Sequence, residues 1–205
     1  RVLLAMASVS EGGEQAPKTT TWGFPLQREG VTLRLFNRGD ASTFAEYRSL
    51  PQVARFQLWS IPFTVQDALA LFSQMNAHGG PHNGEWINVA VVIDNFLVGD
   101  VAIGLNESGD TATLGYTIIP AFQGRGYATR AVQFAIEELR QRGVSRFEAS
   151  LNPSNSASIR VLEKCGFTHT HTDIGTIEKD GELHDDAHYV LNPRPAADGL
   201  KPNFG

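Results

Sequence analysis

A glycine-rich turn at residues 123–128 carries the clearest chemical pattern in this sequence. The turn reads Gln-Gly-Arg-Gly-Tyr-Ala; it follows an apolar run that ends at Pro120, and it opens a helical pattern of apolar residues. A turn between a strand and a helix N-terminus leaves several backbone N–H groups free, with the helix dipole behind them. Glycines let the backbone reach φ > 0 and approach a phosphate. The turn therefore predicts a site for a phosphorylated ligand.

The spacing within the turn narrows the kind of ligand. No nucleotide P-loop is present, and Thr129 stands where a dinucleotide fingerprint needs its third glycine. The pattern Q/R-x-x-G-x-G/A does fit, with Gln123, Gly126 and Ala128. It resembles the pyrophosphate loop of the GNAT superfamily of acyl-CoA N-acyltransferases. A plain strand-turn-helix connection is the alternative interpretation of so short a match.

A second segment, residues 155–167, strengthens the resemblance. Its sequence, Asn-Ser-Ala-Ser-Ile-Arg-Val-Leu-Glu-Lys-Cys-Gly-Phe, is similar to the closing motif of the same superfamily, and most similar to ribosomal-protein N-acetyltransferases of the RimJ/RimL type. Looser matches flank it at residues 31–41, 50–64 and 180–189, so the resemblance runs in order from about Val31 to Leu191.

The resemblance implies that acetyl-CoA is the cosubstrate, held by two stretches of the chain. Ile118 would contact the pantetheine and acetyl groups through its main chain. The cofactor-binding residues implied in this way are Ile118, Gln123, Gly124, Arg125, Gly126, Tyr127, Ala128, Thr129, Asn155 and Ser158.

Catalysis requires a base for the amine and, in many relatives, an acid for the leaving thiolate. Some relatives place a Glu on the strand before the loop, but residues 111–116 contain none, so Glu148 and Asp100 are the carboxylates available as base. The usual tyrosine of the last helix is Leu162 here, and Ser158 matches the serine of the RimJ/RimL-type motif. We take Ser158 and Glu148 as the catalytic candidates. A capping role is the alternative for Ser158, although Asn155 is the better cap by position.

The acceptor is expected to be a primary amine. An α-amine has a pKa of about 8, against about 10.4 for lysine, so a protein N-terminus is the easier nucleophile near neutrality. A polyamine or aminoglycoside is a second candidate, and a GNAT module that binds acyl-CoA without catalysis is a third. The net charge of −5 argues against nucleic acid as partner.

The histidines raise the question of a metal. His169 and His171 precede the predicted last turn, and His184 and His188 follow it with Asp185 and Asp186 nearby. Alternation along facing strands brings some of these side chains together. Structural zinc sites usually have tighter, cysteine-containing spacing. We therefore predict that no metal is needed, and that Cys165 packs in the core.

The order of predicted elements indicates an α/β fold with a mixed sheet of about seven strands flanked by helices, the GNAT fold that the resemblance implies. Strands are expected near residues 31–36, 86–93, 96–105, 111–118, 146–151, 169–178 and 182–191, and helices near 40–50, 64–75, 126–142 and 155–166. We expect an N-terminal arm (1–28), one domain (29–192) and a C-terminal tail (193–205). No apolar run is long enough to span a membrane, the single cysteine fits a cytoplasmic protein, and a homodimer is a possible assembly.

Overall fold

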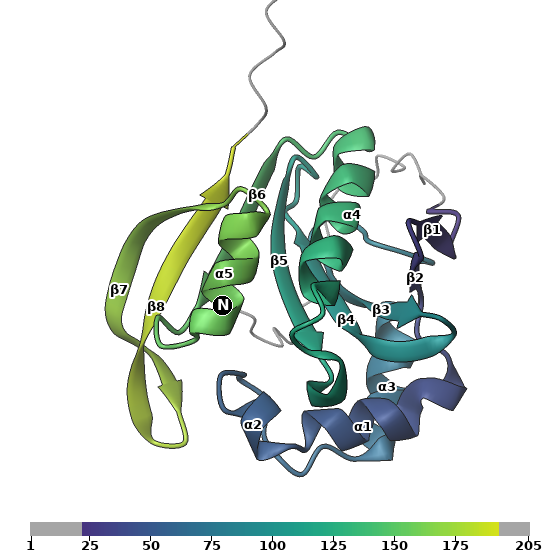
Figure 1. The fold of residues 1–205 in the computed structure, drawn as a ribbon, viewed down its shortest axis with the longest axis horizontal. Helices are drawn as coiled ribbons and strands as arrows, with labels where there is room; N and C mark the ends of the chain where they lie inside the picture. The colour runs from purple at the N-terminus through teal and green to yellow at the C-terminus, as the bar shows by residue number, and fades with distance from the viewer. Residues whose placement is uncertain (1–21, 193–205) are drawn as a thin grey trace, which may run out of the picture.

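A computed structural model, which describes residues 22–192, contains one eight-stranded mixed sheet (Figure 1). The strand order is β1-β2-β3-β4-β5-β6-β8-β7, with antiparallel neighbours except for the parallel pair β5–β6. The strands are β1 (Leu26–Arg28), β2 (Val31–Arg34), β3 (Trp86–Ile93), β4 (Phe96–Leu105), β5 (Thr111–Ile118), β6 (Arg146–Leu151), β7 (Thr168–Lys179) and β8 (Glu182–Leu191).

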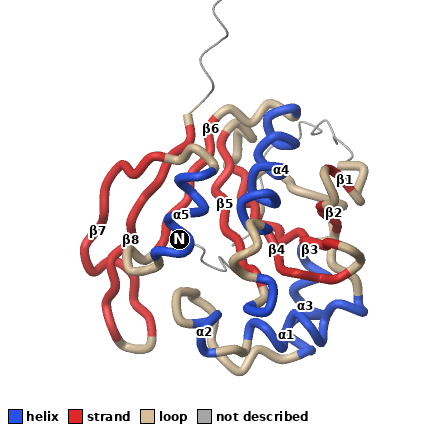
Figure 2. The backbone as a smooth tube through the Cα atoms, viewed as in Figure 1, coloured by secondary structure: helices blue, strands red, loops and turns tan. Residues whose placement is uncertain are grey.

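Five α-helices accompany the sheet, and Figure 2 shows their distribution. In this view α4 and α5 lie in front of the sheet, α1–α3 lie together at its lower edge, and β7 and β8 form a long hairpin at the left. The helices are α1 (Ala41–Arg48), α2 (Pro51–Ala54), α3 (Val65–Met75), α4 (Tyr127–Gln141) and α5 (Ser156–Lys164), with short 3₁₀ turns at Arg38–Asp40 and Pro120–Phe122.

Local sequence signals account for most of these boundaries. The hydroxyl of Thr64 accepts from the Asp67 N–H while the Asp67 carboxylate accepts from the Thr64 N–H, which forms a capping box at the start of α3. Asp94 and Asn95 take positive φ at the turn between β3 and β4. Asn155 caps α5 by accepting a hydrogen bond from the Ser158 N–H. The predicted α/β fold is confirmed, with one strand more than the sequence indicated.

The N-terminal boundary differs from the expected one. Residues 22–28, which the sequence assigned to the arm, pack on the domain: Leu26–Arg28 pairs with β2, and Trp22 is 7% exposed and donates to the Pro81 carbonyl oxygen. A three-residue strand with two exposed side chains has too few apolar positions to give a periodic signal. The rest of the predicted arm and the tail at 193–205 lie outside the described residues.

Asp40 holds the start of α1 in place without capping it. It stands before α1, but its side chain makes no cap hydrogen bond there. Its carboxylate instead accepts from the guanidinium of Arg34 at 2.6 and 2.8 Å and from the Asn37 N–H at 2.8 Å. Asn37 caps the preceding 3₁₀ turn. Asp40 therefore fastens the start of α1 to β2 by an ion pair.

The separation of β5 and β6 creates the space for a ligand. Their parallel register covers only Thr111–Thr113 against Arg146–Glu148. Beyond these residues the two strands part, and the side chains and backbone of Leu114–Tyr116 and Ala149–Leu151 face a cavity between them. Parallel strands joined through α4 thus open at their carboxyl ends, which is where ligands bind in sheets of this kind.

No described helix is long and apolar enough to cross a membrane.

Candidate active site

A cavity of about 420 Å³ lies between the end of β5, the start of α4 and one face of α5. Residues of α2 close its far side. Almost all of the predicted cofactor residues line it: Ile118, Gln123, Gly124, Gly126, Tyr127, Ala128, Thr129, Asn155 and Ser158. The structure thus brings together two sequence motifs that are some thirty residues apart.

The turn before α4 has the geometry that its sequence predicted. Gly124 and Gly126 have φ of +74° and +77°, and a Cβ at either position would meet no atom within 4 Å. Gly126 is the N-cap of α4 and no side chain caps the helix, so its first N–H groups lack side-chain acceptors. The Gln123 side chain donates to the Ile118 carbonyl oxygen at 2.8 Å and anchors the turn to β5. Open space, free N–H groups and the helix dipole together fit a pyrophosphate.

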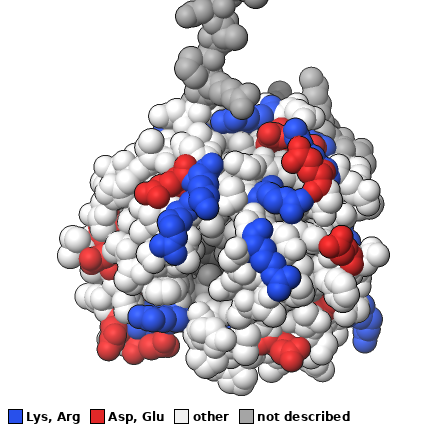
Figure 3. Space-filling model, in the orientation of Figure 1, with Lys and Arg blue, Asp and Glu red and all other residues white. Residues whose placement is uncertain are grey.

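Arg160 and Lys164, one turn apart on α5, add positive charge to this cavity, and no acidic residue is among its lining residues. Figure 3 shows Lys and Arg side chains gathered over α4 and α5, on both sides of a hollow in this face. The charge complements the phosphate groups of coenzyme A. Arg125, which was also predicted to bind the cofactor, is not among the lining residues; its guanidinium donates to the Ala121 carbonyl oxygen at 3.2 Å.

Ser158 stands at the first turn of α5, where this cavity meets a second one. Its backbone N–H is bound by the Asn155 side chain at 3.2 Å, so Asn155 and not Ser158 is the cap. Within the described residues the Ser158 hydroxyl makes no hydrogen bond. The hydroxyl is therefore available to a ligand at the junction of the two cavities.

Tyr116 of β5 lies at the same junction and lines both cavities. Its hydroxyl donates to the Ser158 carbonyl oxygen at 2.7 Å and so connects β5 to α5 across the gap. Burial raises the pKa of Tyr116 well above its usual value, so the hydroxyl stays protonated at neutral pH. This role of Tyr116 could not be predicted, because a tyrosine on an apolar strand normally indicates core packing.

The second cavity, of about 120 Å³, continues from Ser158 between β6, the β7–β8 hairpin and the segment after α2. Apart from Tyr116, its ionisable lining residues are Arg55, Lys179, His184, Asp185 and Asp186. The side chain of Asp186 is buried, and one carboxylate oxygen of Asp185 accepts from the Gly175 N–H at 2.9 Å. Carboxylates in this position attract a protonated amine.

Lys179 holds the hairpin to the opposite side of this second cavity. Its ammonium donates to the carbonyl oxygens of Ala54 and Gln57, both at 2.7 Å, and its side chain is largely buried. The charge of Lys179 is thus directed to the end of α2 and satisfied there. The carboxylates of Asp185 and Asp186 keep their attraction for a cation in the cavity.

The two carboxylates proposed as base from the sequence do not reach this junction. Glu148 pairs with Arg146 at 2.7 Å at the surface, and it is not among the residues that line either cavity. Asp100 is 1% exposed and accepts from Tyr47 Oη at 2.5 Å and Asn88 Nδ2 at 2.7 Å. Burial, followed by the nearby Asp100 charge, raises the pKa of Tyr47 well above its usual range. Asp100, on β4, is a buried hydrogen-bond partner of Tyr47 and Asn88, and Glu148 as the base stays a prediction.

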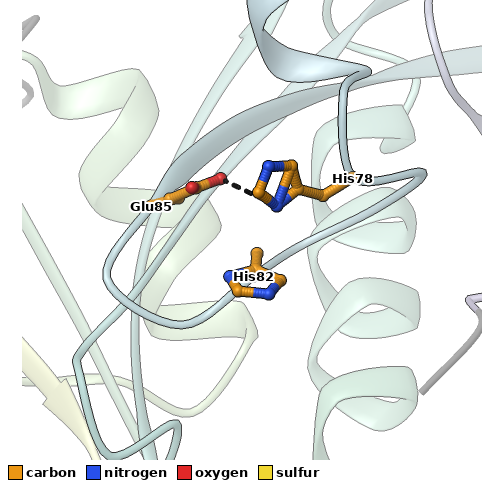
Figure 4. A group of neighbouring side chains, drawn as sticks. All are labelled: His78, His82 and Glu85. Carbon is orange, nitrogen blue, oxygen red and sulfur yellow. Dashed lines mark ion pairs between the residues drawn. The ribbon is translucent and has the colours of Figure 1, made fainter. Parts of the chain in front are cut away.

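The histidines form two small groups. Figure 4 shows the first, in the loop before β3, where the His78 ring faces the Glu85 carboxylate at 3.7 Å and His82 lies beside it. The second group, on β7 and β8, contains His171, Asp173 and His188. Of the four histidines considered from the sequence, the structure therefore brings His171 and His188 together. Neither group lines either of the two cavities.

Cys165 packs as predicted, half-buried behind α4. Its thiol lies 3.8 Å from the Thr129 carbonyl oxygen, and burial raises its pKa to about 11. A thiol in this state is a poor nucleophile.

Comparison with known proteins identifies the architecture. The family model described as the acetyltransferase (GNAT) domain matches residues 31–168, which is more than half of the chain. The chain belongs to the GNAT acetyltransferases. It is an N-acetyltransferase that uses acetyl-CoA.

The structural neighbours of this GNAT acetyltransferase include enzymes with different acceptors. It is 27% identical to YnaD of Bacillus subtilis, an uncharacterized N-acetyltransferase, over 78% of this chain and 92% of the relative. It resembles RimJ of Mycobacterium smegmatis in complex with CoA-disulfide (TM-score 0.70, 22% identity, 79% and 81% of the two chains). It also resembles spermidine N-acetyltransferase of Vibrio cholerae in complex with CoA and spermine (TM-score 0.70, 16% identity, 81% and 97% of the two chains). At these identities the solved structures show the GNAT fold alone.

Proposed function

We propose that this GNAT acetyltransferase acts on a protein N-terminal α-amine, by direct attack of the amine on the thioester in a ternary complex. The observation that carries the proposal is the junction of the two cavities. Phe56, Gln57, Tyr116, Asn155 and Ser158 line both of them, so the two cavities adjoin at these residues. Two substrates placed end to end need no covalent enzyme intermediate.

The separation of β5 and β6 favours a peptide. The edge of β6 at Ala149–Leu151 faces the second cavity, beyond the last residues paired with β5. An extended chain can lie along such a strand edge and gain backbone hydrogen bonds, whereas a small amine cannot. Asp185 and Asp186 lie across the same cavity and suit the positive charge of the N-terminus. These features also support the RimJ/RimL-like assignment made from residues 155–167.

The chemical roles follow from the positions of the groups. Acetyl-CoA supplies the acyl group as a thioester, with its pyrophosphate at the turn before α4. The Ser158 hydroxyl orients the sulfur or carries the proton to it, which are roles for a group that has no other partner nearby. The amine needs little help from a base, since its pKa of about 8 leaves a useful neutral fraction near pH 7. We expect acetyl transfer to survive dialysis against a chelator.

Direct competition between amines tests the acceptor. One peptide has a free N-terminus and no lysine, and its matched partner has an acetylated N-terminus and one lysine; release of CoA is followed for each. We expect faster acetylation of the free N-terminus, with a rate that rises through the amine pKa. A faster reaction with the lysine peptide contradicts the proposal.

A small-molecule amine is the second candidate, and the small volume of the second cavity, about 120 Å³, favours it. Spermidine and an aminoglycoside are therefore included at the same concentrations. A kcat/KM for either that exceeds that of the free N-terminus replaces the peptide with a small acceptor and leaves the acetyl-CoA assignment intact. A cytoplasmic location and a homodimer stay predictions.

A further inference from the structure

One face of the β7–β8 hairpin carries two histidines and two aspartates in a compact group. His171 is paired with His188 across the two strands, and Asp173 with Asp186. Residues two apart on a strand project from the same face, and directly paired residues share a face. The register therefore places all four side chains on one side of the hairpin.

The distances in this group are close to those around a metal ion. His188 Nε2 lies 3.2 Å from Asp173 Oδ2 and 3.6 Å from Asp186 Oδ2, and His171 Nε2 lies 4.0 Å from Asp173 Oδ1. A tetrahedral ion with bonds of about 2.0–2.1 Å holds its ligand atoms about 3.4 Å apart. The side chain of His171 is 59% exposed, so its ring has room to move closer to Asp173.

The buried nitrogen of His188 is the second observation. Its Nε2 atom is inaccessible to solvent and makes no hydrogen bond within the described residues, although two carboxylate oxygens lie near it. A buried polar atom without a partner is costly, and such atoms in native proteins commonly mark a site for an ion or a water. A cation bound between this nitrogen and the two carboxylate oxygens would be a partner for all three atoms.

The neighbouring Thr170 determines which ring nitrogen of neutral His171 carries the proton. The Thr170 hydroxyl donates its single proton to the His188 carbonyl oxygen at 3.1 Å, and its oxygen lies 3.0 Å from His171 Nδ1. The hydroxyl oxygen can then only accept, so Nδ1 of neutral His171 carries the proton and Nε2 presents its lone pair to the group. Histidines that bind metals commonly have their other nitrogen fixed in this way.

From these observations we infer that His171, Asp173 and His188, with Asp186 as fourth ligand, form a binding site for one divalent transition-metal ion such as Zn²⁺. Imidazole nitrogens favour Zn²⁺, Co²⁺ or Ni²⁺ over Mg²⁺ and Ca²⁺, and the two carboxylates balance the charge. The inference does not rest on the proposed acceptor. Three of the four ligands lie outside both cavities, and Asp186 is shared with the second cavity. The His78 group offers three ligands from a loop rather than four from paired strands.

Titration calorimetry with Zn²⁺ tests the site on the full chain, without a histidine tag and after removal of metals by chelation. We expect one ion per chain, and Co²⁺ in its place should give the intense visible absorption of four-coordinate cobalt. His171→Ala and His188→Ala should each weaken binding by at least about tenfold. His171 is exposed, so its variant reports on the site even where His188→Ala fails to fold.

Two matched controls keep the result specific. His169→Ala removes a histidine from the same strand whose ring lies against Thr172 and Tyr189, outside the group, and should leave Zn²⁺ affinity unchanged. His78→Ala removes the centre of the other histidine group and should also leave it unchanged. The inference is wrong if the wild-type protein binds no Zn²⁺ at millimolar concentration, if His169→Ala weakens binding as much as His171→Ala, or if His78→Ala alone abolishes binding.

Discussion

The two cavities that meet at Tyr116 and Ser158 are built in different ways. The first cavity, of about 420 Å³, which we propose for the cofactor, is formed largely by two short continuous segments: the turn before α4 and one face of α5. Apart from tyrosine, its ionisable side chains are Arg160 and Lys164, and both are positive. The second cavity, of about 120 Å³, which we propose for the acceptor, is lined by residues of β6, of the β7–β8 hairpin and of the segment after α2, and these include both positive and negative side chains. On the proposed assignment, local structure holds acetyl-CoA, whereas contacts between distant segments hold the acceptor.

The largest effect should come from the turn before α4. Gly126→Asp puts a carboxylate where the pyrophosphate binds, and we expect acetyl-CoA affinity to fall by at least about a hundredfold through charge repulsion and loss of the close backbone approach. Calorimetry with acetyl-CoA measures this. Gly143→Asp is the matched control, because Gly143 also has positive φ and open space but lies beyond the other end of α4. Equal losses in both variants, or none in Gly126→Asp, contradict the assignment.

The next effect concerns the junction itself. Ser158→Ala should lower kcat about ten- to a hundredfold, as expected for loss of one proton transfer or orienting contact. The free energy of unfolding should change by less than about 1 kcal/mol, because Asn155 supplies the cap. Ser156→Ala, on the exposed side of the same helix turn, is the control. Wild-type kcat in Ser158→Ala would remove Ser158 from the mechanism.

A smaller effect is expected on the acceptor side. Asp186→Asn keeps the shape of the side chain and removes one charge, so the KM for a cationic acceptor should rise about fivefold, roughly 1 kcal/mol, with acetyl-CoA affinity unchanged. Steady-state kinetics with the preferred amine measures it. Asp94→Asn changes an exposed carboxylate at the β3–β4 turn and should alter neither constant. If acetyl-CoA affinity falls instead, the two cavities do not divide the substrates as proposed.

The smallest effect is predicted for the hydrogen bond from Tyr116 that connects β5 to α5. Tyr116→Phe removes the hydrogen bond to the Ser158 carbonyl oxygen and should cost about 1 kcal/mol of stability and a few-fold in kcat. Because the folded-state pKa of Tyr116 is raised, its contribution is complete below the unfolded value of about 10 and is lost as pH rises beyond it. The melting temperature should therefore fall less steeply between pH 8 and pH 11 in the variant than in the wild-type protein. A loss of activity beyond a hundredfold would instead assign Tyr116 to proton transfer.

The same contrast explains what the sequence could predict. The turn at 123–128 and the cap at Asn155 are contiguous patterns whose geometry is set within a few residues, so they could be read directly. Arg160 and Lys164 were missed because charged residues on a helix normally indicate a solvent-facing side. Tyr116 gave no signal because its partner is 42 residues away.

Glu148 shows where strand reasoning was insufficient. Glu148 was chosen because it lies on the strand after α4. Alternation puts its side chain on the same face as that of Arg146, and the two form an ion pair at the surface. The short helix α2 was also missed: no helix was expected between residues 50 and 64, but Pro51 begins one at its first position. The acceptor wall depends on β8 lying between β6 and β7, and no local pattern specifies that order.

The position of β8 has a consequence for how the enzyme is made. β8 follows β7 in the chain, yet it is the strand that joins β7 to β6. A nascent chain that has emerged only as far as α5 already contains the turn before α4 and Ser158, but it lacks the hairpin with Asp185 and Asp186. Every residue that lines the cavity of about 420 Å³ precedes Cys165, so the proposed acetyl-CoA site is complete in sequence before the hairpin is synthesised. A domain generally folds as a unit, so this early segment depends on the last two strands to complete the sheet beside it.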